Sequence, residues 1–198
     1  MSNPVRRPYA KYFRAALAMT AGLALGMIAT FAALTSGYGF SRLHAGPWTA
    51  LPVEGVNLDP YARAAIARSG EAPLGRDQGL VFVATNDSSG APLDGACEYR
   101  VVDPTPAARF WTLSLMTLGG ALIDNPTGRN GFSSVEVLRR EGGGFQIAIA
   151  RNARAGNWLS PGAARRFALA LRLYDTPLDV DASPDPNAFP RIVKLTCA

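Results

Sequence analysis

The chain of 198 residues has room for one folded domain and an appendage, because domains commonly hold about 100 to 200 residues. Hydrophobic residues make up 48% of the sequence and no charge-rich tract occurs, which excludes a largely disordered chain. The formal net charge of +5 comes mainly from Arg6, Arg7, Lys11 and Arg14; the remainder is nearly neutral, without the basic stripe of a nucleic-acid-binding protein.

An uncharged run follows these four basic residues. Residues 15–34 read AALAMTAGLALGMIATFAAL. Residues 35–40, which include two glycines, follow as a less hydrophobic end of the run. Twenty residues of α-helix span about 30 Å, the thickness of the hydrocarbon core of a bilayer. We therefore predict a transmembrane helix over residues 15–38. Aromatic residues flank the run as in interfacial belts: Tyr9, Tyr12, Phe13, Tyr38 and Phe40.

The position of the basic residues predicts the topology of this helix. Short flanks rich in Lys and Arg stay in the cytoplasm, so residues 1–14 are expected inside and the remainder in the periplasm. This makes the bacterial inner membrane the expected location and the lipid bilayer the first expected partner. A cleaved signal peptide is the alternative, although its apolar region would be shorter, about 7 to 15 residues. Both interpretations export the domain.

Residues 39–78 are expected to form a stalk and a short helix that dock on the domain. The first part of this segment contains turn-forming residues in the sequence Gly46-Pro47-Trp48. Asp59 and Pro60 then resemble a helix N-cap and first helical position, which predicts a helix over residues 61–69.

From residue 79 onward the pattern is that of β-strands. Large residues alternate with small or polar ones in FALALRL, residues 167–173, as in a strand with one buried face. Residues 141–144 are expected to form a hairpin turn. Strands are predicted at 80–85, 96–102, 109–117, 121–124, 134–139, 145–150, 167–174 and 191–197. The fold class that follows is mainly β: an antiparallel β-sandwich or jelly-roll of about eight strands over residues 79–198.

Two cysteines lie in predicted strands, Cys97 and Cys197. An even number of cysteines in an exported chain favours one disulfide, which would close a loop of about 100 residues. Two unpaired buried thiols are the alternative. The spacing excludes a CxxC redox or metal motif.

The sequence shows no catalytic constellation. His44 is the single histidine and lies close to the predicted membrane exit, so we expect no metal site and no Ser-His-Asp triad. No phosphate- or dinucleotide-binding glycine motif occurs in a strand-to-helix setting, and no cofactor is expected. Paired carboxylates could cleave a glycan, but Asp87 and Asp94 lie in turn sequences, where a capping role is the simpler interpretation.

Three segments are rich in aromatic, Asn and Arg residues: FWTLSL at 110–115, NPTGR at 125–129, and GNWLSP at 156–161 followed by LRLY at 171–174. In this order they resemble domain-of-unknown-function family 1214 (DUF1214), here of a stand-alone, membrane-anchored proteobacterial type. The resemblance covers roughly residues 80–195, although Ser160 stands where the family usually has proline. It implies a jelly-roll-type sandwich and an exported setting, and it implies no reaction.

The same segments supply the candidate ligand-binding residues, which combine stacking, amide and cationic groups: Trp111, Asn125, Arg129, Asn157, Trp158 and Arg172. Structural roles compete for all six, in the core, in loops or in ion pairs. The favoured hypothesis is a non-catalytic module that binds an envelope protein or glycan while tethered to the membrane. The alternative is a carboxylate- or Arg/Asn-based hydrolase or lyase that acts on an envelope glycan, with two acids close to Trp111 or Trp158.

Overall fold

A computed structural model describes residues 9–36, 43–50, 78–178 and 183–197 of the chain. The chain divides into two units, Met1–Phe40 and Ser41–Ala198. Within the described residues, the first contains the helix α1 (Tyr9–Ser36), and the second contains ten strands and a short 3-10 helix, η2 (Pro186–Ala188).

Helix α1 has the length and composition of a membrane span. Residues Tyr9–Ala33 have a mean hydropathy of 1.8, and their side chains are almost all exposed in the absence of a bilayer. The Thr20 hydroxyl lies 3.0 Å from the carbonyl oxygens of both Ala16 and Leu17, so this polar group is satisfied inside the helix. The helix begins earlier than predicted, at Tyr9, and includes Lys11 and Arg14 in its first turns.

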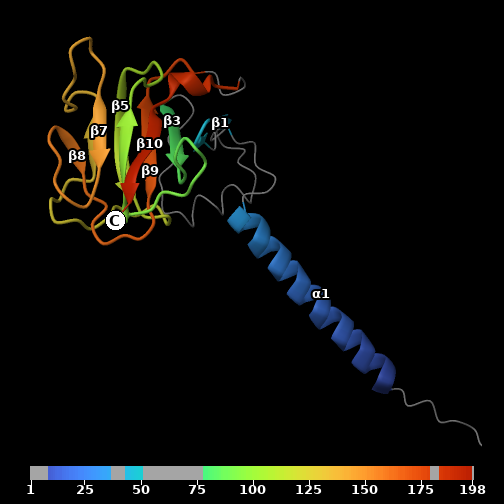
Figure 1. Ribbon diagram of the computed structural model, residues 1–198. Coiled ribbons are helices and arrows are strands. Elements are labelled where there is room, and N and C mark those ends of the chain that lie inside the picture. The colour runs from blue at the N-terminus through green and yellow to red at the C-terminus, as the bar shows by residue number, and fades with distance from the viewer. Residues whose placement is uncertain (1–8, 37–42, 51–77, 179–182, 198) are drawn as a thin grey trace, which may run out of the picture. The chain divides into compact units, whose positions relative to one another are not determined.

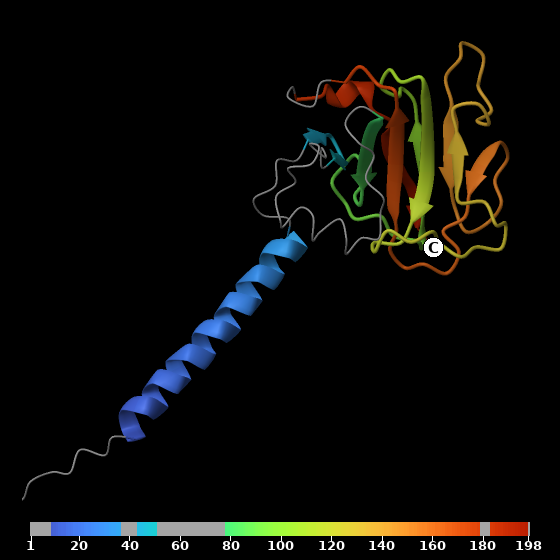
Figure 2. The same ribbon diagram turned by 180° about the vertical axis from the view of Figure 1, so that it is seen from behind.

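The second unit is a mainly β fold of two sheets, as predicted (Figures 1 and 2). The larger sheet has the order β1 (Leu43–Ala45), β2 (Trp48–Ala50), β3 (Gly79–Ala84), β9 (Ala168–Tyr174), β5 (Phe110–Met116) and β6 (Gly131–Ser133). The smaller sheet has the order β10 (Arg191–Cys197), β4 (Cys97–Val102), β7 (Gln146–Ile149) and β8 (Asn157–Leu159). All neighbours are antiparallel except β7 and β8, which run parallel.

The core lies between the inward faces of the two sheets. Strand β9 supplies three leucines to it, Leu169, Leu171 and Leu173, all without solvent exposure. Each is flanked by apolar partners on both neighbouring strands; Leu171, for example, pairs with Phe82 of β3 and Leu113 of β5. Burying each such side chain stabilises the fold by about 1.5 to 3 kcal/mol. The alternation seen in the sequence of β9 therefore sets the register of the sheet centre.

Aromatic pairs join regions of the two sheets. The Trp111 ring on β5 lies 5.0 Å from the ring of Phe145, which directly precedes β7. The Tyr99 ring on β4 meets the Phe167 ring, next to β9, edge-on at 5.7 Å. Such tilted and edge-to-face contacts add to the free energy of area burial.

Part of the predicted stalk belongs to the larger sheet. Residues 43–50 form the β1–β2 hairpin, whose turn has Gly46 at φ +60°. Trp48 is fully buried, and its indole N–H donates to the Pro190 carbonyl at 2.8 Å. The hairpin thereby connects the start of the domain to the segment before β10. The helix expected over residues 61–69 lies outside the described residues.

Two predicted strands are wrong. Residues 121–124 form only an isolated bridge between Met116 and Leu122. Residues 134–139 form a turn, because the Ser133 carbonyl accepts from the backbone of Glu136 and Val137 and curls the chain. The strand in this region is β6, three residues long and immediately before the turn. Of the apolar residues that suggested a strand, Val135 is 81% exposed and Leu138 is 65% exposed, whereas Val137 is buried.

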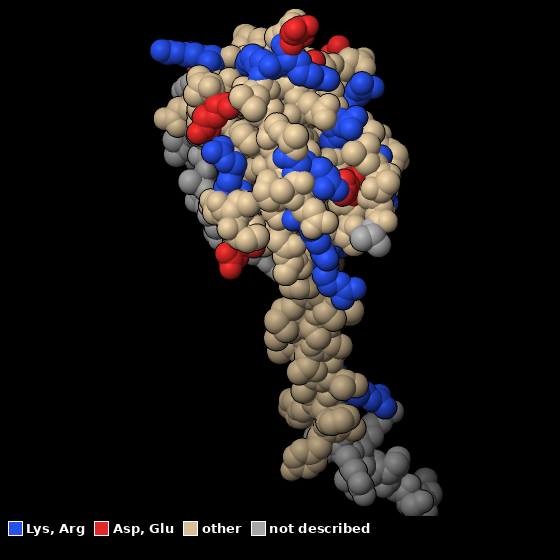
Figure 3. Space-filling view, turned by 60° about the vertical axis from the view of Figure 1, so that its left-hand side comes forward, with Lys and Arg blue, Asp and Glu red and all other residues tan. Residues whose placement is uncertain are grey.

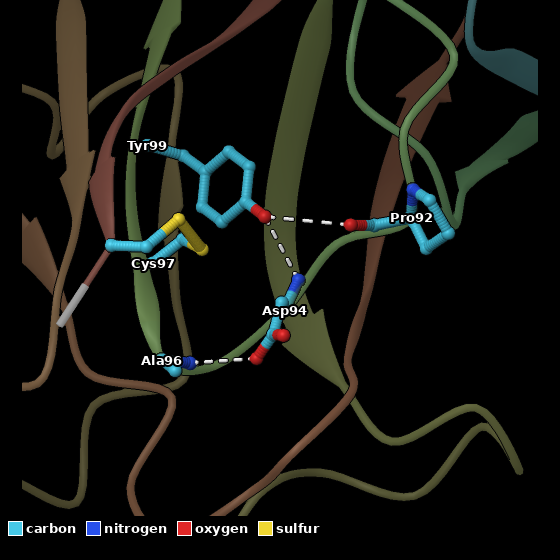
Figure 4. The surroundings of a disulfide bond; sticks show 6 residues. Pro92, Asp94, Ala96, Cys97 and Tyr99 are labelled. Carbon is cyan, nitrogen blue, oxygen red and sulfur yellow. Dashed lines mark hydrogen bonds between the residues drawn. A yellow bond between two sulfur atoms is a disulfide. The ribbon is translucent and has the colours of Figure 1, made fainter.

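The predicted disulfide between Cys97 and Cys197 is confirmed (Figure 4). The two cysteines are register partners on β4 and β10. Along β10 the one buried side chain is Ile192, and the residues from Val193 to Cys197 are exposed. The second half of β10 thus has little apolar packing, and the disulfide attaches it covalently to β4.

Turn residues beside the disulfide have the capping roles expected of them (Figure 4). The carboxylate of Asp94 accepts from the backbone N–H of Ala96 at 2.8 Å. The Tyr99 hydroxyl accepts from the Asp94 N–H at 2.9 Å and lies 3.5 Å from the Pro92 carbonyl. Burial raises the pKa of Tyr99, so its phenol stays neutral.

Asp87 holds the neighbouring turn. One of its carboxylate oxygens accepts three hydrogen bonds, from the N–H and hydroxyl of Ser89 and from the N–H of Ala91. Burial raises the pKa of this carboxyl, but these hydrogen bonds and the charge of Lys194 outweigh it, so the pKa of Asp87 is lowered. Its other oxygen is buried without a partner among the described residues.

The disulfide is expected to stabilise the domain by about 4 to 5 kcal/mol on the chain-entropy model, because it closes a loop of about 100 residues. Urea denaturation of the full-length chain in detergent micelles, with and without reductant, measures this. A Cys97→Ser/Cys197→Ser variant is the control, since its stability should equal that of the reduced wild-type chain. A wild-type midpoint that reductant leaves unchanged would contradict the expectation.

Replacing Asp87 with Ala is expected to lower the free energy of unfolding by about 1 to 3 kcal/mol, because three partly buried donors lose their acceptor. The pKa of Asp87 is lower in the folded chain than the ordinary value of 3.8. Its stabilisation is therefore complete above that pH and is lost as pH falls through the folded-state pKa. Urea midpoints measured from neutral pH to pH 3 should show a smaller acid-induced decrease in Asp87→Ala than in wild type. Asp175→Ala, at an exposed position, provides the control. If acid lowered the urea midpoint equally in wild type, Asp87→Ala and Asp175→Ala, the assignment of this role to Asp87 would be wrong.

Candidate functional site

An open pocket of about 560 Å³ lies between the loops around β6 and strand β8. Its wall combines aromatic, aliphatic, cationic and anionic groups: Thr127, Arg129, Phe132, Glu136, Leu138, Gly156, Asn157 and Trp158. Strand β6 is the edge of the larger sheet and β8 is the edge of the smaller one. The pocket therefore occupies a side of the sandwich, where residues of two distant sequence motifs meet.

Arg129 reaches the pocket from the turn that follows Asn125. The Asn125 side chain closes this turn: its oxygen accepts from the N–H and hydroxyl of Thr127, and its nitrogen donates to the carbonyls of Ile123 and Arg129. Gly128, at φ +64°, supplies the left-handed conformation that the turn needs. Asn125 is thus a structural residue that positions Arg129.

The guanidinium of Arg129 lies over the ring of Phe132, 4.9 Å from the ring centre. This cation–π contact orients an otherwise exposed side chain and leaves its N–H donors available to a ligand. Glu136 is the carboxylate of the pocket, and it accepts from the hydroxyl and N–H of Ser133 at 2.8 and 3.2 Å. These hydrogen bonds, with a smaller effect from the charge of Arg129, lower the pKa of Glu136.

Asn157 connects the wall of the pocket to the sheet. Its oxygen accepts from the Leu138 N–H at 2.7 Å, and its nitrogen donates to the carbonyls of Leu138 and Gln146. The amide thus bonds the peptide groups of Leu138 as a neighbouring strand would. With the side chain only 5% exposed, the amide has a structural role and fixes the turn against β8.

Trp158 lies beside Asn157 on β8 but faces the opposite way, because alternate residues of a strand point to opposite faces. It is half-buried, and its indole N–H donates to the Ala150 carbonyl at 2.8 Å. With this donor occupied, the indole offers a ligand its apolar surface.

The other two candidates lie elsewhere. Trp111 is 4% exposed and packs in the core against Phe145. Arg172 is half-buried on β9, with Nη2 3.9 Å from the sulfur of Met116. Of the six predicted residues, the structure brings Arg129, Asn157 and Trp158 together at the pocket. Their role in ligand binding stays a prediction.

Sequence reasoning missed Phe132, Glu136 and Leu138. A signal for Glu136 is present in the sequence, since Ser133 and Glu136 have the spacing of a capping box, S-x-x-E. Within the described ranges, no group of three or more His, Cys, Asp or Glu residues is arranged to hold a metal ion.

The two tryptophans of the motifs are expected to differ in stability effect. Trp111→Ala should lower the free energy of unfolding by about 3 to 5 kcal/mol, because it leaves a cavity in the core. Trp158→Ala should cost at most about half as much, since part of the ring is already in water. Urea denaturation followed by circular dichroism measures both. A larger loss for Trp158→Ala would contradict the assignment.

A solved structure of another protein agrees with this fold. The crystal structure of the VPA0106 protein from Vibrio parahaemolyticus is similar, with a TM-score of 0.54 and 19% identity over 69% of this chain and 36% of that chain. An uncharacterised Burkholderia cenocepacia protein has a TM-score of 0.43 and 20% identity over 63% of this chain and 31% of that chain. The chain thus spans about a third of the length of both. No curated protein matches.

A family model described as a protein of unknown function, DUF1214, matches residues 78–178. This range begins just before β3 and ends just after β9, so it includes both the Asn125–Arg129 turn and the Asn157–Trp158 strand. The chain belongs to the DUF1214 family.

Proposed function

We propose that this protein is a membrane-tethered, periplasmic binding module whose side pocket holds a glycan of the cell envelope. The observation that carries the proposal is the convergence of Arg129 and Trp158, from two separate motifs, on one open pocket. Neither side chain is fully buried, so both are accessible to a ligand.

The chemistry of the pocket suits a sugar. A pyranose has an apolar face that can stack on the indole of Trp158, as flat ligands do on aromatic rings. Its hydroxyl groups can accept from the guanidinium of Arg129 and donate to the carboxylate of Glu136. Hydrogen bonds made by the buried side chains of Asn125 and Asn157 hold the two walls in place before a ligand arrives, which lowers the entropic cost of binding.

Binding is better supported than catalysis. A glycosidase of the two-carboxylate type needs a second acid opposite the first, and Glu136 is the one carboxylate among the described residues of the pocket. The hydrogen bonds from Ser133 lower its pKa, whereas a general acid near neutral pH needs a raised one. The hydrolase or lyase hypothesis therefore has less support here than the binding module.

The membrane-spanning helix supports the proposal that the ligand belongs to the cell envelope. Helix α1 has 28 residues, about 42 Å at 1.5 Å per residue, which is enough to cross a bilayer. Basic residues at its start favour a cytoplasmic N-terminus. The disulfide agrees with an oxidising compartment, because such bonds are rare in the cytosol. A domain tethered there meets cell-wall and surface glycans at high local concentration.

The test is binding of the purified full-length chain, in detergent micelles, to an array of bacterial envelope glycans. Trp158→Ala and Arg129→Gln are each expected to weaken binding about tenfold or more, because a stacking surface or a charge-assisted hydrogen bond is lost. Arg109→Gln is the matched control, since it removes the same charge at an exposed ion pair with Asp175. Unchanged glycan binding by both pocket variants would overturn the proposal.

A further inference from the structure

One row of side chains crosses the outer face of the smaller sheet, starting from Trp158. The strand register pairs Trp158 of β8 with Ala148 of β7, Ala148 with Arg100 of β4, and Arg100 with Val193 of β10. Register partners lie on the same face. The residues beside them in the strands, such as Tyr99 and Ile149, are buried in the core, so this row faces outward.

The side chain at the middle of the row is small, so the surface there is shallow. Ala148 has only a methyl side chain, and no larger group in the row rises between Trp158 and Arg100. Strands lie about 4.8 Å apart, so β8 and β4 are separated by about 10 Å, the length scale of two linked sugar rings. The shallow strip thus connects an aromatic surface with a cation.

Positive charge dominates this strip. Arg100 lies in the row itself, and Arg191 lies on the same face two residues from Val193 along β10. Both are exposed, and neither forms an ion pair within the described part of the chain. Glu98, the acidic residue of β4 on the same face, is neutralised by its ion pair with Arg154. Figure 3, in which the side of Figure 1 that carries β7 and β8 comes forward, shows more blue than red on the face of the domain in view.

We infer that the strip continues the pocket and binds an anionic oligosaccharide, with one sugar ring at Trp158 and a carboxylate or phosphate group of a later ring at Arg100. This inference rests on the proposed function, since Trp158 belongs to both surfaces. Guanidinium groups match the planar, two-oxygen geometry of such anions.

A sugar chain fits the surface better than an acidic peptide. An extended peptide gains affinity by pairing its backbone with the edge of a sheet. The strip lies on the face of the sheet, where backbone groups already pair with the neighbouring strands. The indole N–H of Trp158 is also occupied by Ala150, which leaves stacking as its contribution.

The experiment is calorimetric titration of the full-length chain with three probes: tetragalacturonate, the neutral tetrasaccharide made by reducing its carboxylates, and tetraglutamate. Wild type should bind tetragalacturonate at least tenfold more tightly than either of the others. Arg100→Gln should weaken tetragalacturonate binding about tenfold and leave binding of the neutral tetrasaccharide unchanged. Arg109→Gln, at the ion pair with Asp175, should change neither.

The outcomes separate the two proposals. If Trp158→Ala loses tetragalacturonate while Arg100→Gln binds it as wild type does, the pocket stands and the strip is overturned. If Trp158→Ala and Arg100→Gln both bind tetragalacturonate as wild type does, the strip is overturned, and the pocket is overturned too if Arg129→Gln also binds as wild type does. Equal affinity for the acidic and neutral tetrasaccharides, or preference for tetraglutamate, would also overturn the strip as an anionic-sugar site. Circular dichroism of each variant verifies that it is folded.

Discussion

Burial of the facing apolar surfaces of two sheets is the constraint on which the rest of this structure depends. The leucines of β9 lie at the centre of the larger sheet, and neighbouring strands align their own apolar residues with them. A slip of one residue would move Leu169, Leu171 and Leu173 to the other face of the sheet, where the small side chains of Ala168 and Ala170 are buried. The register of β9 therefore fixes which residues of β3 and β5 face inward, and with them the positions of both sheet edges.

The pocket is a consequence of those edges. Strands β6 and β8 are short, and the chain between them must turn sharply to close the side of the sandwich. Such turns leave backbone groups that need partners, and Asn125 and Asn157 supply them. Two amides that resemble ligand-binding residues in sequence thus serve the backbone. They hold Arg129 and Trp158 at the surface, where binding is possible.

The same geometry supports the proposal of a binding module over that of a hydrolase or lyase. A β-sandwich with a half-buried indole, an oriented guanidinium and one carboxylate with a lowered pKa offers stacking and hydrogen bonds. The strand register connects the pocket to the outer face of the smaller sheet, because Trp158 shares a row with Ala148 and Arg100. The proposed site spans a side of the sandwich and an adjoining sheet face, and such a site would suit a chain-like ligand better than a small one.

The sequence by itself determined the apolar helix, the mainly β fold, the disulfide and the family. Each depends on local or pairwise information: an uncharged run long enough for a bilayer, strict alternation as in β9, and two cysteines in an exported chain. Tertiary structure alone decided the rest. Residues 134–139 alternate like a strand, but the bond between Ser133 and Glu136 curls them into the pocket wall. Trp111 and Trp158 have similar sequence surroundings, yet one lies in the core and the other at the surface. Which face of the sheet a side chain points to, and which strand lies at an edge, depend on which strands become neighbours. Contacts between residues far apart in the chain decide that.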